Sequence, residues 1–358
     1  MQRILSLATL GVLGGLVWMF LSGGGLSQLA VDPATGQPAA GAPGSDWNLS
    51  DVWNSPPAPA PGQPTSAGYA PPTSVGAAAP PGMDRTIRIA SFNIQDFGDT
   101  KANRPEVMAT LAEIIRRFHV VALQEISTKN TYHMPNFIRG VNSSGRKYDF
   151  VISDRAGNSN QKEQFAYVFD TEAVEIDRQS VYSVGDPDNL LSREPHVATF
   201  RTRVAPAEAF TFILINVHTD PSPESLPGEL DALAEAYRVV RRASRDEDDV
   251  IMVGDFNADD SHLGRLGQIP DIAPLLGRQR FTSNTRENRL LDNLVIHKPS
   301  TMEFAGNSGV FNFRTGLGIE LPLDQVETVS DHYPVWADFS VYELDYQRRV
   351  ASRRTSAR

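Results

Sequence analysis

The chain has 358 residues, of which 41% are hydrophobic, 21% are charged and none is cysteine. These fractions are ordinary for a globular protein, so they exclude a multi-spanning membrane protein, a fully disordered chain and a fibrous repeat. The lack of cysteine excludes disulfides, thiolate metal sites, iron–sulfur clusters and a cysteine nucleophile. The net charge of −10 fits poorly with a nucleic-acid binder that relies on basic patches. It is compatible with an enzyme that meets phosphates through bound cations.

The first segment, residues 1–21, is typical of a secretory signal peptide or an uncleaved membrane anchor. Arg3 supplies a positive charge, and residues 4–21 form an uncharged, mostly apolar run close to the ~20 residues that span a bilayer. A buried core helix is the less favoured interpretation, because the run lies at the terminus. We therefore expect the rest of the chain outside the cytoplasm, either secreted or anchored to the membrane through residues 4–21.

The next segment, residues 22–84, is predicted to be a linker. It contains almost no periodic apolar pattern, and 12 of the chain's 25 prolines lie between Pro33 and Pro81, mixed with glycine, alanine and serine. Such a segment buries too little apolar surface to offset its ordering entropy. We expect a flexible chain or one with polyproline II character.

Residues 85–344 are predicted to form one α/β domain with a layered core. Apolar residues at helical spacing mark one helix over residues 107–118 and another over residues 230–240. Apolar runs or alternation mark the expected strands, which are residues 87–94, 120–124, 165–169, 197–201, 210–218, 250–256, 292–297 and 334–341. Strands and helices alternate without a break, which favours a single large layered fold.

The last segment, residues 345–358, is a tail with five arginines and one aspartate. One interpretation is a disordered solubilising end, and the other is weak attraction to polyanions or lipid headgroups. The first 84 residues carry a net charge of −3 and the tail carries +4, so the domain between them carries −11. The net negative charge of the chain therefore comes from the domain.

Polar side chains stand at the ends of several apolar strands of this domain. They are Asn93, Glu125, His218, Asp255, Asn257, Asp292, Asp331 and His332. Each one alone is more often a turn residue or a cap, but their conjunction indicates a site where strand ends and loops meet. Carboxylates and carboxamides supply hard oxygen ligands for Mg²⁺ or Ca²⁺, and two histidines supply proton transfer near neutral pH. No serine elbow, Walker loop or GxGxxG supports a different chemistry.

The motifs SFNIQDFG, LQE, NSNQKEQF, LSREP, NVHTDP, GDFNAD, LDNLVI and SDHYPV follow one another in this order. By the residues of these motifs and by their order, the chain resembles the endonuclease/exonuclease/phosphatase superfamily. Within the superfamily it resembles the deoxyribonuclease I branch. The match covers residues 86–342. The resemblance implies a four-layer α/β sandwich, in which two packed β-sheets are flanked by helices.

The resemblance also implies a metal centre. Asn93 and Glu125 would hold the divalent cation, with Asp331 close by. Asp255 and Asn257 would orient the water, the scissile phosphate or a second metal, which makes Asp255 a metal ligand as well. The implied cofactor is Mg²⁺, with Ca²⁺ or Mn²⁺ as alternatives.

The same resemblance implies two catalytic pairs and one phosphate contact. His218 would pair with Glu163, and His332 with Asp292, because a carboxylate fixes the tautomer of an imidazole and raises its basicity. Arg193 would contact a phosphate oxygen through its planar guanidinium. The alternatives are a solvated charge at Glu163, a strand-start cap at Asp292 and a surface ion pair at Arg193.

Three departures from the deoxyribonuclease I pattern concern the substrate side. Ser127 stands where that branch has an arginine that enters the minor groove, and Asn160 or Gln161 replaces a tyrosine that stacks on a sugar. The disulfides of that branch are missing. Near one lost bridge, a Ca²⁺ loop or an acidic exposed loop is expected from Asp186, Asp188, Asn189 and Glu194.

The sequence thus predicts a divalent-metal-dependent phosphodiester hydrolase. The leading interpretation is an extracytoplasmic DNA endonuclease with DNA as its partner, a possible membrane contact through residues 4–21, and no evident obligate protein partner. The alternative is a phosphatase or phospholipase of the same superfamily, acting on phosphoinositide, sphingomyelin or another phosphoester. A third interpretation is a binding module that has kept the fold without the chemistry.

Overall fold

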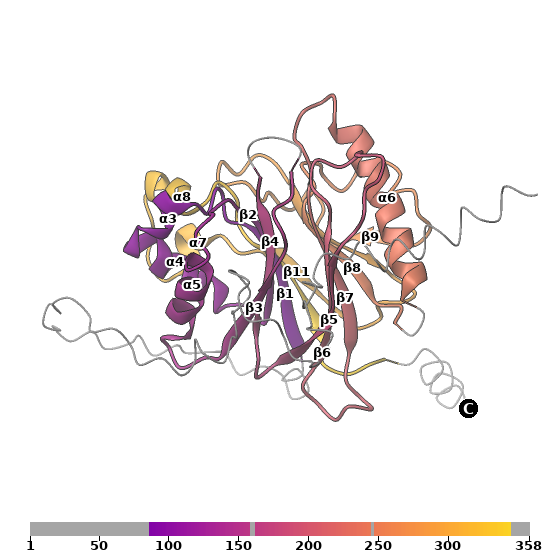
Figure 1. Ribbon diagram of the computed structural model, residues 1–358, viewed down its shortest axis with the longest axis horizontal. Coiled ribbons are helices and arrows are strands. Elements are labelled where there is room, and N and C mark those ends of the chain that lie inside the picture. Colours follow the sequence, from indigo (N-terminus) through magenta and orange to yellow (C-terminus); the bar gives the residue numbers. More distant parts are fainter. Residues whose placement is uncertain (1–85, 158–161, 245–246, 345–358) are drawn as a thin grey trace, which may run out of the picture. The chain divides into compact units, whose positions relative to one another are not determined.

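The computed structural model describes residues 86–157, 162–244 and 247–344. The predicted signal or anchor, the linker, the tail and the two residues Asn160 and Gln161 lie outside this part. None of the described helices is long and apolar enough to cross a membrane. The described chain forms two β-sheets that face each other, with helices on both outer sides (Figure 1).

The first sheet has six strands in the order β11-β12-β1-β2-β4-β3. Their bounds are β1 (Thr86–Asn93), β2 (Val120–Ile126), β3 (Tyr148–Ile152), β4 (Gln164–Asp170), β11 (Phe304–Val310) and β12 (Val335–Ser340). β1 runs parallel to β2 and antiparallel to β12. Five helices pack against this half of the molecule: α3 (Asp99–Ala102), α4 (Pro105–Ile115), α5 (His133–Asn142), α7 (Phe313–Gly316) and α8 (Leu323–Val329).

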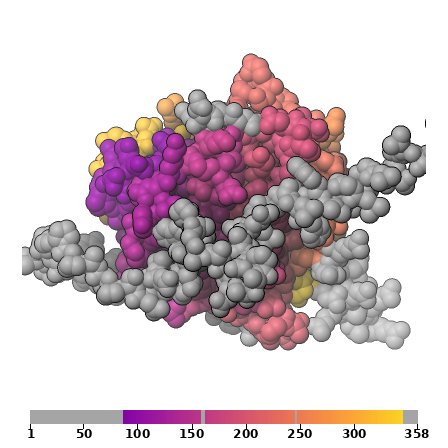
Figure 2. All heavy atoms as spheres, viewed as in Figure 1, coloured from indigo at the N-terminus to yellow at the C-terminus, as the bar shows by residue number. Residues whose placement is uncertain are grey.

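The second sheet also has six strands, in the order β5-β6-β7-β8-β10-β9. Their bounds are β5 (Val174–Ser183), β6 (His196–Thr202), β7 (Thr211–His218), β8 (Val250–Asp255), β9 (Ile272–Pro274) and β10 (Asp292–His297). β7 and β8 are parallel, and the long helix α6 (Leu226–Ala243) packs on their outer face. The space-filling view shows the indigo and purple helices of the first half on one side and the pink to orange segments of the second half on the other (Figure 2).

The central strands are apolar on both faces because both faces are covered. On β7, Phe212 and Leu214 join the core between the two sheets, whereas Ile213 and Ile215 join the core under α6. β1, β2 and β8 divide their residues between two cores in the same way. This explains the continuous apolar runs in the sequence. The expected four-layer sandwich is confirmed, and each predicted strand is present.

Several elements were not predicted from the sequence. β5 carries mostly exposed or half-buried polar residues, β11 reads FAGNSGV with two glycines, and β9 has only three residues. These strands lie at the sheet edges or beside them, where fewer side chains are buried. The helix α5 was also missed, although five of its ten residues are buried.

The register of the second sheet brings the predicted site together. His218 at the end of β7 lies opposite Asp255 at the end of β8, and Asp255 lies opposite Asp292 at the start of β10. Gly254 is required beside them, because its φ is +152° and a Cβ there would meet the carbonyl oxygen of Val217 at 2.0 Å. Three polar residues on neighbouring strands therefore meet at one edge of the sheet.

Candidate active site

The carboxylate of Asp255 stands at the centre of the site. Its side chain is buried, and Oδ2 lies 3.7 Å from Nε2 of His218 and 3.7 Å from Nε2 of His332. The same oxygen accepts a hydrogen bond of 3.2 Å from Nδ2 of Asn93 at the end of β1. Because β1 belongs to the other sheet, the two sheets meet through this contact. One carboxylate oxygen thus faces both imidazoles.

Each imidazole is held from behind by a buried carboxylate. Nδ1 of His218 lies 2.7 Å from Oε1 of Glu163, and Nδ1 of His332 lies 2.8 Å from Oδ2 of Asp292. A carboxylate only accepts hydrogen bonds, so Nδ1 carries the hydrogen in both rings and Nε2 faces Asp255. Asp292 Oδ2 also accepts from the hydroxyl of Ser283 at 2.7 Å, which fixes the carboxylate in turn. The structure brings both sequence-predicted pairs together; their roles in proton transfer stay predictions.

The charges around the two imidazoles favour their protonated forms. Burial lowers the pKa of His332, but the carboxylates of Asp292 and Asp255 outweigh it and raise that pKa to about 10. Burial likewise lowers the pKa of His218, while the hydrogen bond and charge of Glu163 and the charge of Asp255 raise it above the ordinary value. Positive charge at Nε2 is therefore stabilised at both positions, as a proton donor requires.

Two further carboxyl and amide groups form the wall of the site beside Asp255. Asn93 Nδ2 also donates to Oε1 of Glu125 at 2.8 Å, and the backbone N–H of Asp96 donates to Oε2 at 2.8 Å. Glu125 has a φ of +63°, and the pairing of β2 with β4 shifts between Leu123 and Ile126. Backbone strain of this kind occurs where a side chain is re-aimed at a functional site.

The donor set fits a hard divalent cation. Glu125 and Asp255 both accept from one amide group of Asn93, so two carboxylates converge on the same small region. Ligand atoms of Asp255, Asp292 and His332 also lie within 4.8 Å of one another. Asp331 stands at the rim with an exposed side chain, and its charge acts on His332. Of the four predicted metal ligands, the structure brings Asn93, Glu125 and Asp255 into contact and leaves Asp331 at the edge.

Arg193 lies behind the His218 pair instead of in front of it. Its Nε is 2.9 Å from Oε1 of Glu163 at an ion-pair distance, although the two groups are not aligned for a hydrogen bond. Nη1 is buried and has no hydrogen-bonding partner among the described residues. The guanidinium thus shares the carboxylate that holds His218. Its predicted contact with a phosphate stays a prediction.

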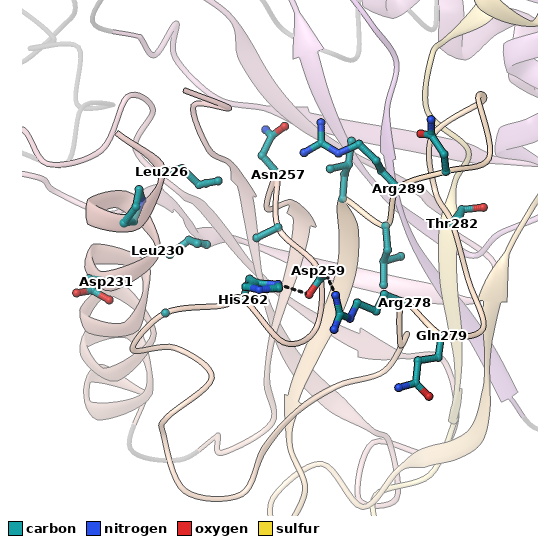
Figure 3. A pocket seen from close by; sticks show the side chains of 16 residues that line it. Leu226, Leu230, Asp231, Asn257, Asp259, His262, Arg278, Gln279, Thr282 and Arg289 are labelled. Carbon is teal, nitrogen blue, oxygen red and sulfur yellow. Dashed lines mark hydrogen bonds and ion pairs between the residues drawn. The ribbon is translucent and has the colours of Figure 1, made fainter. Parts of the chain in front are cut away.

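Asn257 joins the catalytic centre to a neighbouring pocket. Its φ is +49°, its backbone N–H donates to Oδ1 of Asp255 at 2.9 Å, and its Nδ2 donates to the carbonyl of Thr219 at 2.9 Å. The side chain also lines a pocket of about 830 Å³ next to α6 (Figure 3). Arg278 and Arg289 line the same pocket, and Arg278 forms an ion pair with Asp259. The pocket adjoins the site through Asn257, and its charged lining residues are of both signs, with Asp231 and Asp259 beside the two arginines.

Lys101 is a residue that the sequence analysis missed. Its Nζ donates to the carbonyls of Ile94, Gln95 and Val329, at 2.8 Å for Ile94 and 3.0 Å for Val329. It therefore ties the end of β1 to the end of α8, just before Asp331. Burial lowers the pKa of Lys101 to about 8 against the raising effect of nearby carboxylates. A lysine in a four-residue polar helix gives no sequence signal of this role.

The substrate-side departures have mixed outcomes. The Ser127 hydroxyl donates a hydrogen bond to the carboxylate of Asp96, so a serine paired with an aspartate stands in the place of the arginine of the deoxyribonuclease I branch. In the proposed Ca²⁺ loop, Asp186 Oδ2 accepts from the backbone N–H of Leu191 at 2.6 Å and closes a turn. The acidic groups of that loop are not among the described carboxylates that converge on a common point. The two alternatives for this loop, a Ca²⁺ loop and an acidic exposed loop, stay predictions.

Comparisons with known proteins identify the family. A model of the endonuclease/exonuclease/phosphatase family matches residues 90–332. The chain belongs to this family. Deoxyribonuclease gamma of Rattus norvegicus is 31% identical over 266 residues, covering 70% of this chain and 83% of that protein. Deoxyribonuclease-1 of Oryctolagus cuniculus is 28% identical over 263 residues, covering 70% and 91%.

A solved structure agrees with the fold. Truncated Caenorhabditis elegans TDP2 superposes with a TM-score of 0.51 at 14% identity, over 71% of this chain and 98% of that one. The expected resemblance to the superfamily and to deoxyribonuclease I is confirmed. As a member of this family with deoxyribonuclease relatives, the chain is an enzyme, a hydrolase that acts on phosphodiester bonds.

Proposed function

We propose that residues 85–344 form a divalent-metal-dependent DNA endonuclease that works outside the cytoplasm. The observation that carries the proposal is the position of the two imidazoles. Each is held by a buried carboxylate, and both Nε2 atoms lie 3.7 Å from one oxygen of Asp255. Two oriented imidazoles on one small site are suited to removing a proton from an attacking water and giving one to a leaving oxygen.

In the proposed mechanism the protein's own groups divide the work. One imidazole takes the proton of the attacking water, and the other, in its protonated form, donates to the leaving oxygen. Glu163 and Asp292 keep both rings in the tautomer and orientation that these transfers need. A divalent cation held by Glu125 and Asp255, with Asn93 beside them, would supply positive charge for the phosphoryl oxygens.

Asn257 and Asp255 are proposed to orient the reacting groups. Asn257 is locked by its two hydrogen bonds to Asp255 and Thr219, so its side chain is fixed at the border between the imidazoles and the arginine-lined pocket. A fixed amide dipole at this place needs no reorganisation when charge develops on a phosphoryl oxygen.

DNA is the proposed substrate because relatives that are 31% and 28% identical to this chain carry the name of deoxyribonucleases. The domain carries −11, so bound cations would be needed to bring a polyanion to the site. We propose Mg²⁺ for this role, with Ca²⁺ or Mn²⁺ as alternatives. The location outside the cytoplasm rests on residues 1–21, and separation of soluble and membrane fractions tests whether they are cleaved or retained.

A plasmid-nicking assay on the purified full chain tests the function. Mg²⁺ should convert supercoiled plasmid to the relaxed form, EDTA should stop the conversion, and His218→Ala should slow it about 10²- to 10⁴-fold. His297→Ala is the matched control, because His297 lies at the other end of β10 from Asp292 and its Nδ1 is 2.9 Å from the hydroxyl of Ser300. A folded protein that leaves plasmid intact but hydrolyses a phospholipid or another phosphoester would replace the nuclease by the superfamily alternative.

A further inference from the structure

The pocket of about 830 Å³ next to α6 continues directly into the catalytic edge of the second sheet. Its walls come from the first turns of α6, from the residues that follow β8 and from the segment between β9 and β10. Asn257 stands two positions after Asp255, and Leu291 stands one position before Asp292. The pocket is therefore placed to hold a part of the substrate that lies next to the reacting group.

The lining of the pocket combines apolar and charged groups. The apolar part consists of Leu226, Pro227, Leu230, Ala258, Leu290 and Leu291. The charged part contains Asp231, Asp259, Arg278 and Arg289. An apolar wall with a few placed polar groups is typical of pockets for small organic ligands, whose volumes run from ~300 to ~1,000 Å³. A nucleotide has the same division, because its base and sugar offer carbon surface and its phosphate carries the charge.

Both aspartates of the lining have cationic partners within the protein. Asp231 forms an ion pair of 3.1 Å with Nε of Arg265. Asp259 Oδ2 lies 3.5 Å from Nη1 of Arg278, and its Oδ1 lies 2.7 Å from Nδ1 of His262. Arg265 and Arg278 therefore balance the two negative charges of the lining.

Arg289 is the cation of the lining that pairs with no carboxylate among the described residues. Its main chain is fixed, because its N–H donates to Oδ1 of Asn284 at 2.8 Å and its carbonyl accepts from the N–H of Ser283 at 2.8 Å. In Figure 3 its guanidinium extends toward the amide of Asn257. A guanidinium offers its N–H donors in a planar fork that matches a phosphate.

We propose that this pocket binds a nucleotide that neighbours the scissile phosphodiester in the DNA strand, with its phosphate on the guanidinium of Arg289. The inference rests on the proposed nuclease function and adds a substrate contact to it. The sugar and base of that nucleotide pack against the leucines of the apolar wall. The contact also offsets part of the repulsion between a polyanion and a domain that carries −11. It favours a strand of nucleotides over a phosphodiester that carries a single phosphate.

Two substrates separate this contact from the catalytic centre. Plasmid DNA carries phosphates on both sides of the scissile one, whereas bis(4-nitrophenyl) phosphate has one phosphate in all. Arg289→Gln should lower the ratio of kcat/KM for plasmid nicking to kcat/KM for this ester about 10-fold at saturating Mg²⁺, mainly through the KM for plasmid. The variant is expected to fold, because the side chain of Arg289 is exposed.

Arg286→Gln is the matched control for charge. Arg286 belongs to the same loop and is exposed, but it lies 3.9 Å from Glu327 and does not line the pocket. The control should keep the parent's ratio. A fall of the same size in Arg286→Gln would show that the net charge of the loop sets the rate, and it would overturn the proposed contact.

A neutral methylphosphonate linkage tests whether the partner of Arg289 is a neighbouring phosphate. One such linkage in the middle of a labelled duplex removes a single charge, and gel mapping measures cleavage at each linkage around it. The parent should lose about 10-fold at one linkage near the neutral position, and Arg289→Gln should show no such loss there. The same loss in both proteins would overturn the contact.

The outcomes distinguish this proposal from the nuclease function. A parent chain that leaves plasmid intact would overturn the nuclease function and the contact with it. If the parent nicks plasmid, an Arg289→Gln variant with the parent's ratio of the two kcat/KM values would overturn the contact alone.

Discussion

The two ends of β8 carry acidic residues in opposite surroundings. At the carboxyl end, Asp255 faces two imidazoles and an amide, and the charges raise the pKa of His332 to about 10. At the amino end, Asp249 faces other carboxylates, and burial together with Glu303 raises its own pKa to about 10. The carboxylate at one end of the strand thus faces an amide and two imidazoles, whereas the negative charge of the carboxylate at the other end is opposed by its neighbours.

The comparison shows that the role of a buried carboxylate depends on its neighbouring groups more than on its degree of burial. Asp255 and Asp249 are both 1% exposed. The amide of Asn93 donates a hydrogen bond to Asp255, and the two imidazoles face the same carboxylate oxygen. Around Asp249, burial and the nearby carboxylates of Glu303 and Glu247 oppose its negative charge, so the protonated form is favoured there.

The largest expected effect compares the two ends directly. Asp255→Asn should lower the nicking rate at saturating Mg²⁺ by about 10³-fold or more, because both imidazoles and the metal centre lose their shared carboxylate. Asp249→Asn makes the same chemical change at the other end of the strand and should leave the rate within about twofold. Rates of plasmid relaxation measure both variants. Equal losses in the two would show that the strand's general integrity, and not the chemistry at Asp255, sets the rate.

The next effect concerns the carboxylates behind the imidazoles. Asp292→Asn should slow nicking about 10²-fold and lower the pKa of His332, because the strongest charge that favours the imidazolium is removed. NMR titration of the imidazole in EDTA measures the pKa, and the nicking assay measures the rate. A pKa that stays above the ordinary histidine range in Asp292→Asn would assign the shift to Asp255 alone.

A smaller effect concerns stability at the active-site end. Lys101→Met keeps the length of the side chain but leaves the carbonyls of Ile94, Gln95 and Val329 without their donor. We expect the free energy of unfolding to fall by about 2–3 kcal/mol. Urea denaturation in EDTA measures it, with Lys147→Met as the control, since the exposed Lys147 forms an ion pair with the exposed Glu172. Equal stability of the two variants would show that Lys101 does not tie the segments.

The smallest effect is the pH dependence at the far end. The folded-state pKa is raised to about 10 for Asp249, about 8 for Glu247 and about 7 for Glu303, above the unfolded values near ~4. The folded chain therefore holds protons that the unfolded chain has lost, so stability falls as pH rises from about 4 to about 10. In EDTA, Tm should decline between pH 6 and pH 9, and less steeply in Asp249→Asn. Parallel curves for the two proteins would contradict this.

Much of the fold could be predicted because its central strands are covered on both faces. The run FILINVH of β7 and the run VIMVGD of β8 carry apolar residues on both sides, so their strand character is visible locally. The edge strand β5 and the glycine-containing β11 could not be found this way. Their residues are held by pairing with neighbours and not by their own burial pattern.

Part of the candidate site could also be predicted from the apolar strands. Asn93, His218 and Asp255 each end an apolar strand, and parallel pairing brings such ends to one edge. The pairing of His218 with Glu163 came from the family resemblance, since 55 positions separate them in the sequence. The contacts of Lys101 and of Asp249 could not be predicted from the sequence, because they are made with residues that are distant in the chain.

The most direct test of the account is a change of leaving group. Plasmid DNA needs a protonated leaving oxygen, whereas a 4-nitrophenyl ester of thymidine 5′-phosphate releases a leaving group that needs no proton. Both His218→Ala and His332→Ala should be slow on plasmid, and one of the two should recover most of the parent's rate on the ester. That recovery would assign the proton donor and leave the other imidazole as the base. Failure of both variants to recover, or normal plasmid nicking by either, would contradict proton transfer by the imidazole pair at Asp255.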